Sequence, residues 1–196
     1  MMSEESRVWP PISGDFIVKN PQGCVAICTL GKRLDVPGNY AIIGTCKTEN
    51  IGIERVIVNI VSNPMIRFFI LAGPEVPGHL TGSSLKSLYE QGVETETRKI
   101  IGAPGAIPYI ENIPLDAVER FRMQVDFIDM MNSSNLEKIS AKAEELESKN
   151  PGPLEQSALW IEFKSSSTRA QVKGLAAQVI LLPEYGLSFN PHLSLV

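Results

Sequence analysis

The stretch Phe68-Phe69-Ile70-Leu71-Ala72-Gly73-Pro74-Glu75-Val76-Pro77-Gly78-His79-Leu80-Thr81-Gly82 joins an uninterrupted apolar run to a loop rich in glycine and proline. An apolar run without alternation is typical of a strand buried on both faces, as in a parallel sheet. In open α/β sheets, ligands bind just beyond the carboxyl ends of such strands. The loop carries His79, one of only two histidines in the chain. The stretch therefore predicts a ligand site with an imidazole at the edge of a parallel sheet.

Strand-like and helix-like patterns alternate along the rest of the chain. Runs rich in apolar residues predict strands at 24–30, 40–46, 66–71, 99–102 and 125–130, and the first two are expected to be buried. The last of these could also continue the preceding helix, but we favour a strand. Apolar residues spaced along one face predict helices at 53–61, before Gly92, after Pro114 and after the capping box 134–137. This alternation favours an α/β fold with a doubly wound, mostly parallel sheet.

The clearest break in the chain is Asn150-Pro151-Gly152-Pro153, where proline and glycine end a helix. We therefore expect one domain at 8–150 and a C-terminal extension of unknown role at 151–196. Within the extension, the runs at 159–163 and 179–182 are strand-like, so its structure is expected to be partly β.

The composition is that of an ordinary globular protein, with 196 residues, 43% hydrophobic and 20% charged. A net charge of −4 does not favour binding to nucleic acid, whose phosphates attract basic proteins. The three cysteines form no CxxC pair, which favours buried, reduced thiols. No basic segment followed by an apolar core begins the chain, and no apolar run is long enough for a membrane span. We expect a cytoplasmic protein.

Three loops rich in small or ring residues are expected to meet at one edge of the sheet, at 47–50, 75–82 and 102–108. Glycine allows close approach of the backbone to a ligand, and proline fixes the shape of a loop. This combination suits a large, flat or extended ligand. The fingerprints G-x-G-x-x-G and G-x-x-x-x-G-K-[ST], and the G-x-S-x-G elbow, are absent. A stand-alone nucleotide-binding enzyme is therefore disfavoured.

His79 has three interpretations from the residues alone. It could hydrogen-bond within its loop, act as a catalytic acid or base, or bind a metal, because imidazole suits several transition metals. A single imidazole cannot form a metal site, but it can supply one axial ligand to a metal held by a macrocycle. Lys47 and Glu49 could contact a polar cofactor edge or pair with each other on the surface. His192 carries no signal of function.

Several distinctive blocks occur along the chain. They are Gly44-Thr45-Cys46-Lys47-Thr48-Glu49-Asn50-Ile51-Gly52-Ile53-Glu54, Asn59-Ile60-Val61-Ser62-Asn63-Pro64, Ile66-Arg67-Phe68, Gly78-His79-Leu80-Thr81-Gly82 and Ile101-Gly102-Ala103-Pro104-Gly105-Ala106-Ile107-Pro108-Tyr109-Ile110-Glu111-Asn112-Ile113-Pro114. These blocks strongly resemble the corrinoid-carrying A subunit of tetrahydromethanopterin S-methyltransferase from methanogenic archaea. The resemblance covers about Trp9 to Asn150, and the blocks occur in the same order in the family.

The resemblance implies a cobamide held by a Rossmann-like domain, with cobalamin or 5-hydroxybenzimidazolyl cobamide as the cofactor. In the family, the cobalt accepts a methyl group from methyl-tetrahydromethanopterin and donates it to coenzyme M, while other subunits catalyse the two half-reactions. The family's cobalt ligand falls on His79 through the Gly-His-[Leu/Ile]-Thr-Gly match. Glu75 and Thr81 are candidates, by proximity, for the partner of the other imidazole nitrogen.

The resemblance and the three loops together provide a set of expected cofactor contacts around His79, the expected axial ligand of cobalt. These contacts are Thr29, Leu30, Gly31, Lys47, Thr48, Glu49, Asn50, Gly73, Glu75, Gly78, Leu80, Thr81, Gly82, Gly102, Ala103, Pro104, Gly105, Ala106, Ile107 and Pro108.

The chain departs from the usual family member after Pro151, where no terminal membrane helix is recognisable. We therefore expect a soluble homologue without a membrane anchor, which carries methyl groups between partner methyltransferase proteins and does not take part in sodium export. The alternative is a cobalamin-binding or regulatory interaction module that has lost methyl transfer.

Overall fold

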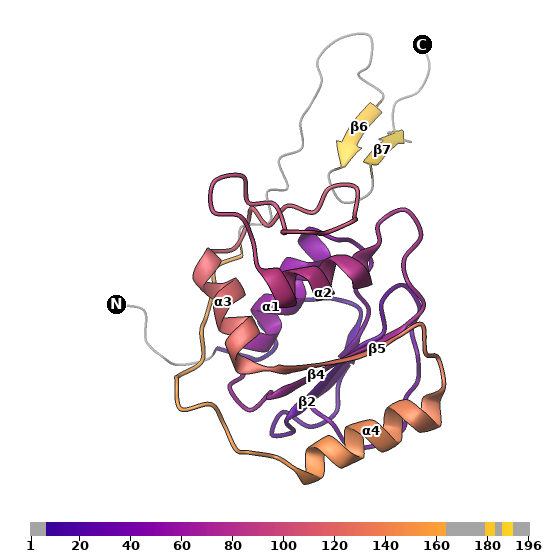
Figure 1. The fold of residues 1–196 in the computed structure, drawn as a ribbon, viewed down its shortest axis with the longest axis vertical. Helices are drawn as coiled ribbons and strands as arrows, with labels where there is room; N and C mark the ends of the chain where they lie inside the picture. Colours follow the sequence, from indigo (N-terminus) through magenta and orange to yellow (C-terminus); the bar gives the residue numbers. More distant parts are fainter. Residues whose placement is uncertain (1–6, 164–178, 183–185, 190–196) are drawn as a thin grey trace. The chain divides into compact units, whose positions relative to one another are not determined.

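The computed structural model describes residues 7–163 in full, together with the backbone of 179–182 and 186–189. The chain divides into two units, Met1–Phe163 and Lys164–Val196. The first contains a five-stranded sheet with the order β1-β3-β2-β4-β5 (Figure 1). Its strands are β1 (Phe16–Val18), β2 (Val25–Cys28), β3 (Ile42–Gly44), β4 (Phe68–Gly73) and β5 (Asp126–Met131).

Four of the five strands run parallel. In the central register, Ala26 of β2 lies opposite Ile42 of β3 on one side and opposite Phe69 of β4 on the other. Strand β5 continues the sheet beyond β4 in parallel register. Strand β1 is antiparallel and covers the edge of β3, with Phe16 opposite Gly44. The predicted α/β fold with a mostly parallel sheet is confirmed.

Helices cover both faces of the sheet. They are α1 (Ile51–Val61), α2 (Thr81–Gln91), α3 (Leu115–Gln124) and α4 (Leu136–Ser148). Helices α1, α2 and α3 lie on one face, and α4 lies on the other (Figure 1). Successive residues of a strand point to opposite faces, so Phe69 and Leu71 join the core beneath α1–α3, while Ile70 joins the core beneath α4. All three cysteines are buried and free, as expected.

Two predicted strands are wrong. The segment 99–102 forms only isolated bridges, Val93 to Ile100 and Lys99 to Tyr109, because it pairs locally between α2 and α3 and does not join the sheet. The run at 159–163 is outside any strand, and the N–H of Leu159 instead donates to the carbonyl of Val61, the last residue of α1 (Ile51–Val61), at 3.0 Å. The preferred strand at 125–130 is confirmed as β5.

Residues 151–163 belong to the first unit and pack against the rest of it. The N–H of Leu154 donates to the carbonyl of Pro64 at 2.9 Å, and the buried guanidinium of Arg120 donates to the carbonyls of Gln156 and Ser157, each at 3.1 Å. The division into a cofactor domain at 8–150 and an extension at 151–196 stays a prediction.

The second unit contains the strands β6 (Val179–Leu182) and β7 (Gly186–Phe189), which pair in antiparallel register. The expected β structure at 179–182 is therefore confirmed, while His192 lies outside the described residues. Among the described residues, no helix has both the length and the apolar character needed to cross a membrane.

Gly73 and Gly78 form a matched pair for testing the packing at the end of β4. Both have a left-handed φ, +83° and +80°. A Cβ atom on Gly73 would overlap the carbonyl oxygen of Thr29, whereas a Cβ atom on Gly78 would meet no atom within 4 Å. We expect Gly78→Ala to lower the free energy of unfolding by about 1 kcal/mol, the cost of the backbone conformation. Gly73→Ala should cost about 3 kcal/mol or more, because β2 and β4 must also separate. Denaturant unfolding measures both, and equal losses would contradict the packing role of Gly73.

Candidate functional site

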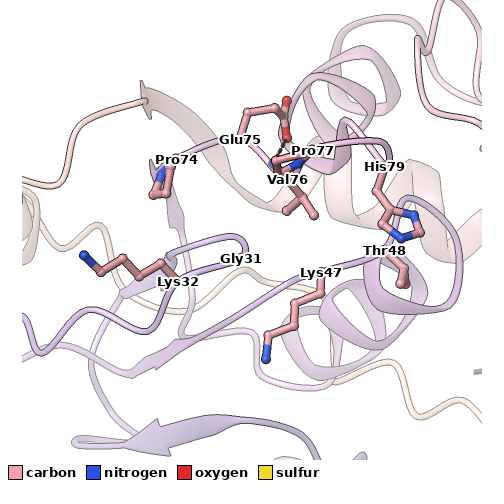
Figure 2. A pocket seen from close by; sticks show the side chains of 9 residues that line it. All are labelled: Gly31, Lys32, Lys47, Thr48, Pro74, Glu75, Val76, Pro77 and His79. Atoms are coloured by element: carbon pink, nitrogen blue, oxygen red, sulfur yellow. Dashed lines mark hydrogen bonds between the residues drawn. The ribbon is translucent and has the colours of Figure 1, made fainter. Parts of the chain in front are cut away.

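A pocket of about 420 Å³ lies beyond the carboxyl ends of the three central strands. The chain leaves β2 for its neighbour β3 and then crosses to its other neighbour, β4, which makes this edge a topological switch point, the usual ligand site of doubly wound sheets. The lining residues follow β2 (Gly31, Lys32), β3 (Lys47, Thr48) and β4 (Pro74, Glu75, Val76, Pro77, His79). Figure 2 shows His79 and Lys32 on opposite sides of the view.

The loop at 102–108 reaches the same place from outside the sheet. The N–H of Ile107 donates to Oε1 of Glu49 at 2.8 Å, and the N–H of Gly105 donates to Oγ of Ser84 in α2 at 3.2 Å. The predicted meeting of three loops is confirmed, although this loop follows a local bridge and not a strand of the sheet.

Glu49 and His79 form the central contact of the site. Nδ1 of His79 lies 2.7 Å from Oε2 of Glu49. The Glu49 side chain is 1% exposed, whereas that of His79 is 51% exposed. Burial opposes ionisation of Glu49, but hydrogen bonds from Ile107, from its own N–H and from His79 outweigh burial and hold its pKa below the ordinary value. A neutral imidazole that donates Nδ1–H to this carboxylate carries its lone pair on Nε2.

The expectation that Glu75 or Thr81 would be the partner of the imidazole is wrong, because the loop after β3 brings Glu49 to Nδ1 of His79. Glu75 instead caps α2. Its oxygens accept hydrogen bonds from the N–H groups of Gly82 and Ser83 and from the Ser83 hydroxyl, all at 2.8 Å. The N-cap residue itself, Leu80, offers no side-chain cap. Oγ1 of Thr81 is buried without a hydrogen-bond partner among the described residues.

Lys47 and Glu49 do not pair on the surface, since Glu49 is buried against His79. Lys47 lies 4.0 Å from Asp15, which also pairs with Arg33 at 3.1 Å. Lys47 therefore remains on the solvent side of the pocket, while Glu49 supports the site from within.

The expected cofactor contacts fall into two groups in the structure. Those that line the pocket are Gly31, Lys47, Thr48, Glu75 and His79. The others include residues that support the lining from behind. Thr29 and Leu30 are buried beneath it, and Asn50 caps α1 through its side chain. Their roles as cofactor contacts stay a prediction.

Several glycines of the expected set face the protein itself. A Cβ atom on Gly82 would lie 2.7 Å from Sδ of Met131, and a Cβ atom on Gly102 would collide with the side chain of Gln91. Lys32, Pro74, Val76 and Pro77 line the pocket without having been predicted. The only signal that could have identified them is that they follow the ends of β2 and β4, next to residues that were predicted.

The fold and the pocket define an α/β protein with a pocket at its switch point, where one histidine contacts a buried carboxylate. Comparison with known sequences identifies the family. The sequence model of the tetrahydromethanopterin S-methyltransferase A subunit matches residues 3–171, so the chain belongs to this family.

Individual relatives agree with this assignment. The chain is 45% identical over 181 residues to the first of two tetrahydromethanopterin S-methyltransferase A subunits of Methanobrevibacter ruminantium, which covers 89% of this chain and 74% of the relative. It is 50% identical over 158 residues to the second A subunit of the same organism, and the alignment covers 79% of this chain and 82% of that subunit. It is 44% identical over 166 residues to the A subunit of Methanocaldococcus jannaschii, and the alignment covers 82% of this chain and 68% of that subunit. The resemblance seen in the sequence blocks is confirmed.

Replacing Glu75 with glutamine tests its role as the cap of α2. Burial opposes the ionisation of Glu75, but the hydrogen bonds from Gly82, Val76 and Ser83 lower its pKa below the ordinary value. A carboxyl whose pKa is lowered by folding stabilises the protein above its unfolded pKa, and this contribution is lost as the pH falls through the folded pKa. We expect Glu75→Gln to cost about 1–2 kcal/mol of unfolding free energy at neutral pH.

The difference from the unsubstituted protein should shrink below about pH 4, as the carboxyl protonates. Denaturant unfolding across this range is the measurement. The exposed Glu96, changed to glutamine, is the matched control. A loss that is independent of pH would contradict the role of the charge.

Proposed function

We propose that this protein is a methyl carrier that binds a cobamide, either cobalamin or 5-hydroxybenzimidazolyl cobamide, at the switch-point pocket. Membership of a methyltransferase family supports a transferase role in general. The observation that carries the finer proposal is the contact between His79 and the buried carboxylate of Glu49 at the pocket.

The donor set fits a metal that is already held by a macrocycle. Nδ1 of His79 is bound to a carboxylate, as is usual for histidines that ligate metals. Nε2 has no hydrogen-bond partner among residues 7–163, and the half-exposed imidazole borders the pocket. One oriented imidazole would be sufficient as the protein's ligand to such a metal.

The residues of the chain would bind and orient the group. His79 would bind the cobalt through Nε2, and Glu49 would hold the proton on Nδ1. The prolines at 74 and 77 limit the conformations of the histidine loop, and Glu75 ties that loop to α2. A bound cobamide supplies a cobalt centre that takes up and releases a methyl group. The protein's part is orientation and tuning of that centre.

We further propose that separate methyltransferase proteins donate and accept the methyl group. The expected cytoplasmic location and the absence of a membrane anchor stay predictions. Fractionation of cells that express the full chain tests both.

The decisive experiment is a titration of the protein with cobalamin, followed by visible absorption spectra. We expect stoichiometric binding and a spectrum that changes when His79 is replaced by alanine, because the axial ligand is then lost. His192→Ala is the matched control, since it removes the only other histidine and should leave the spectrum as it is. An unchanged spectrum in His79→Ala would remove His79 from the axial role, and the absence of cobalamin binding would refute the proposal.

Transfer of the methyl group is tested separately. The protein loaded with chemically reduced cobalamin is incubated, without oxygen, with labelled methyl-tetrahydromethanopterin and a methyltransferase that uses this donor. We expect label on the protein fraction, and its release when a thiol acceptor and its methyltransferase are added. Binding of cobalamin without any labelling would favour the alternative, a cobalamin-binding or regulatory module.

Glu49→Gln tests the support of the imidazole. The substitution keeps the size of the side chain but removes the charge that accepts from Nδ1. Loss of a partner behind a metal-binding histidine commonly lowers affinity by about 10–100-fold. We expect a loss of cobalamin affinity in this range, measured by titration against the Glu96→Gln control. An affinity within about twofold of the unsubstituted protein would show that Glu49 does not tune the ligand.

A further inference from the structure

The loop at 103–108 reaches the Glu49–His79 pair through its backbone. Oε1 of Glu49 accepts from the N–H of Ile107 at 2.8 Å, while Oε2 of the same carboxylate lies 2.7 Å from Nδ1 of His79. One buried carboxylate therefore connects this loop with the imidazole. A loop outside the sheet thus supplies one of the hydrogen bonds that hold the pair.

Gly105 allows this loop to lie closer to the pair than a residue with a side chain could. A Cβ atom at this position would lie 2.6 Å from Cγ of Glu49, 2.7 Å from the carbonyl oxygen of His79 and 2.7 Å from Oγ of Ser84. The φ angle of Gly105 is outside the left-handed region, so the position requires space and not an unusual torsion. Each partner of the pair thus limits the space at Gly105.

The loop is held to the site mainly from its inner side. The N–H of Gly105 donates to the hydroxyl of Ser84 at 3.2 Å, and Ser84 is fully buried in α2. In contrast, Pro104 and Ala106 are exposed, and the Ile107 side chain is 59% exposed. The backbone groups that point inward therefore set the position of the loop over Glu49.

We propose that residues 103–108 form a clasp that holds the Glu49 carboxylate against Nδ1 of His79, with Gly105 as its positioning residue. With the clasp in place, the imidazole proton stays on Nδ1, which donates a hydrogen bond to Oε2 of Glu49. The lone pair of the neutral ring then lies on Nε2, the nitrogen that faces no protein partner among the described residues. The clasp thereby selects the tautomer that can bind a metal through Nε2, and this inference rests on the proposed function.

The tautomer of His79 can be measured without any corrinoid. Nitrogen-15 NMR of the protein distinguishes a protonated Nδ1 from a protonated Nε2 in the neutral ring, and spectra are recorded at increasing pH until the imidazole signals no longer change. The His192→Gln variant assigns the signals, because the chain has two histidines. We expect the unsubstituted protein to hold His79 almost entirely with its proton on Nδ1.

Gly105→Ala should shift His79 toward a mixture of tautomers, because the added methyl group displaces the loop or the Glu49 side chain. Ser84→Ala is an independent variant that removes the acceptor of the Gly105 N–H without adding volume, and it should produce a smaller shift in the same direction. Gly14→Ala is the control, since a Cβ atom there would meet only the ring of Phe16, at 3.2 Å. Unchanged tautomers in both Gly105→Ala and Ser84→Ala would overturn the clasp.

Cobalamin titration of the same variants separates the clasp from the proposed function. We expect Gly105→Ala to lose about tenfold or more in affinity and Gly14→Ala to lose none. If the unsubstituted protein binds cobalamin through His79 while Gly105→Ala keeps both the tautomer of His79 and the affinity for cobalamin, the proposed role of the clasp is refuted and the proposed function is supported. If the tautomer of His79 shifts in Gly105→Ala but the unsubstituted protein binds no cobalamin, the proposed role of the clasp is supported and the proposed function is refuted.

Discussion

The site depends on one buried charge, the carboxylate of Glu49. Burial of an unpaired carboxylate is costly, so such a group is retained only where donors surround it. In this protein the donors come from separate loops, the imidazole of His79 and the backbone of Ile107. Glu49 is therefore stable in its place only when both loops are correctly positioned. The same contacts that keep it ionised thus also fix the geometry of the pocket edge.

Glu49 and His79 also lie close to the N-termini of two helices. Helix α1 begins at Ile51 and α2 begins at Thr81, so each member of the pair directly precedes a helix by two residues. The N-terminus of a helix carries partial positive charge and stabilises nearby anions. Glu75, which accepts from the N–H groups of Gly82 and Ser83 in α2, is stabilised in this way, and Glu49 lies one residue before Asn50, the N-cap of α1. The doubly wound topology, which places successive strand-to-helix turns at one edge, thus concentrates acidic groups where an imidazole must be oriented.

The pattern of apolar residues predicted the central sheet because β2, β3 and β4 are short apolar runs. Helix-like segments separate β3 from β4 and β4 from β5. It missed β1, which has only three residues and pairs at an edge. It placed a strand at 99–102 because an apolar run looks the same whether it joins a sheet or bridges locally. His79 and the three loops were identified from the sequence. The partner of His79 was not, since Glu49 lies 30 residues away and only the parallel order of β3, β2 and β4 brings their loops together.

Glycine shows most clearly why a pattern of residues underdetermines a site. Small residues in ligand loops suggest backbone that approaches a cofactor, and this was the interpretation of the three loops. In the structure, a Cβ atom on Gly73, Gly82 or Gly105 would collide with the protein itself. These glycines therefore bring segments of the chain close together, whereas a Cβ atom on Gly78 would meet no atom within 4 Å. Close packing around the half-exposed imidazole limits the space beside the Glu49–His79 contact, so these glycines have a packing role in the site in addition to the cofactor contacts predicted for them.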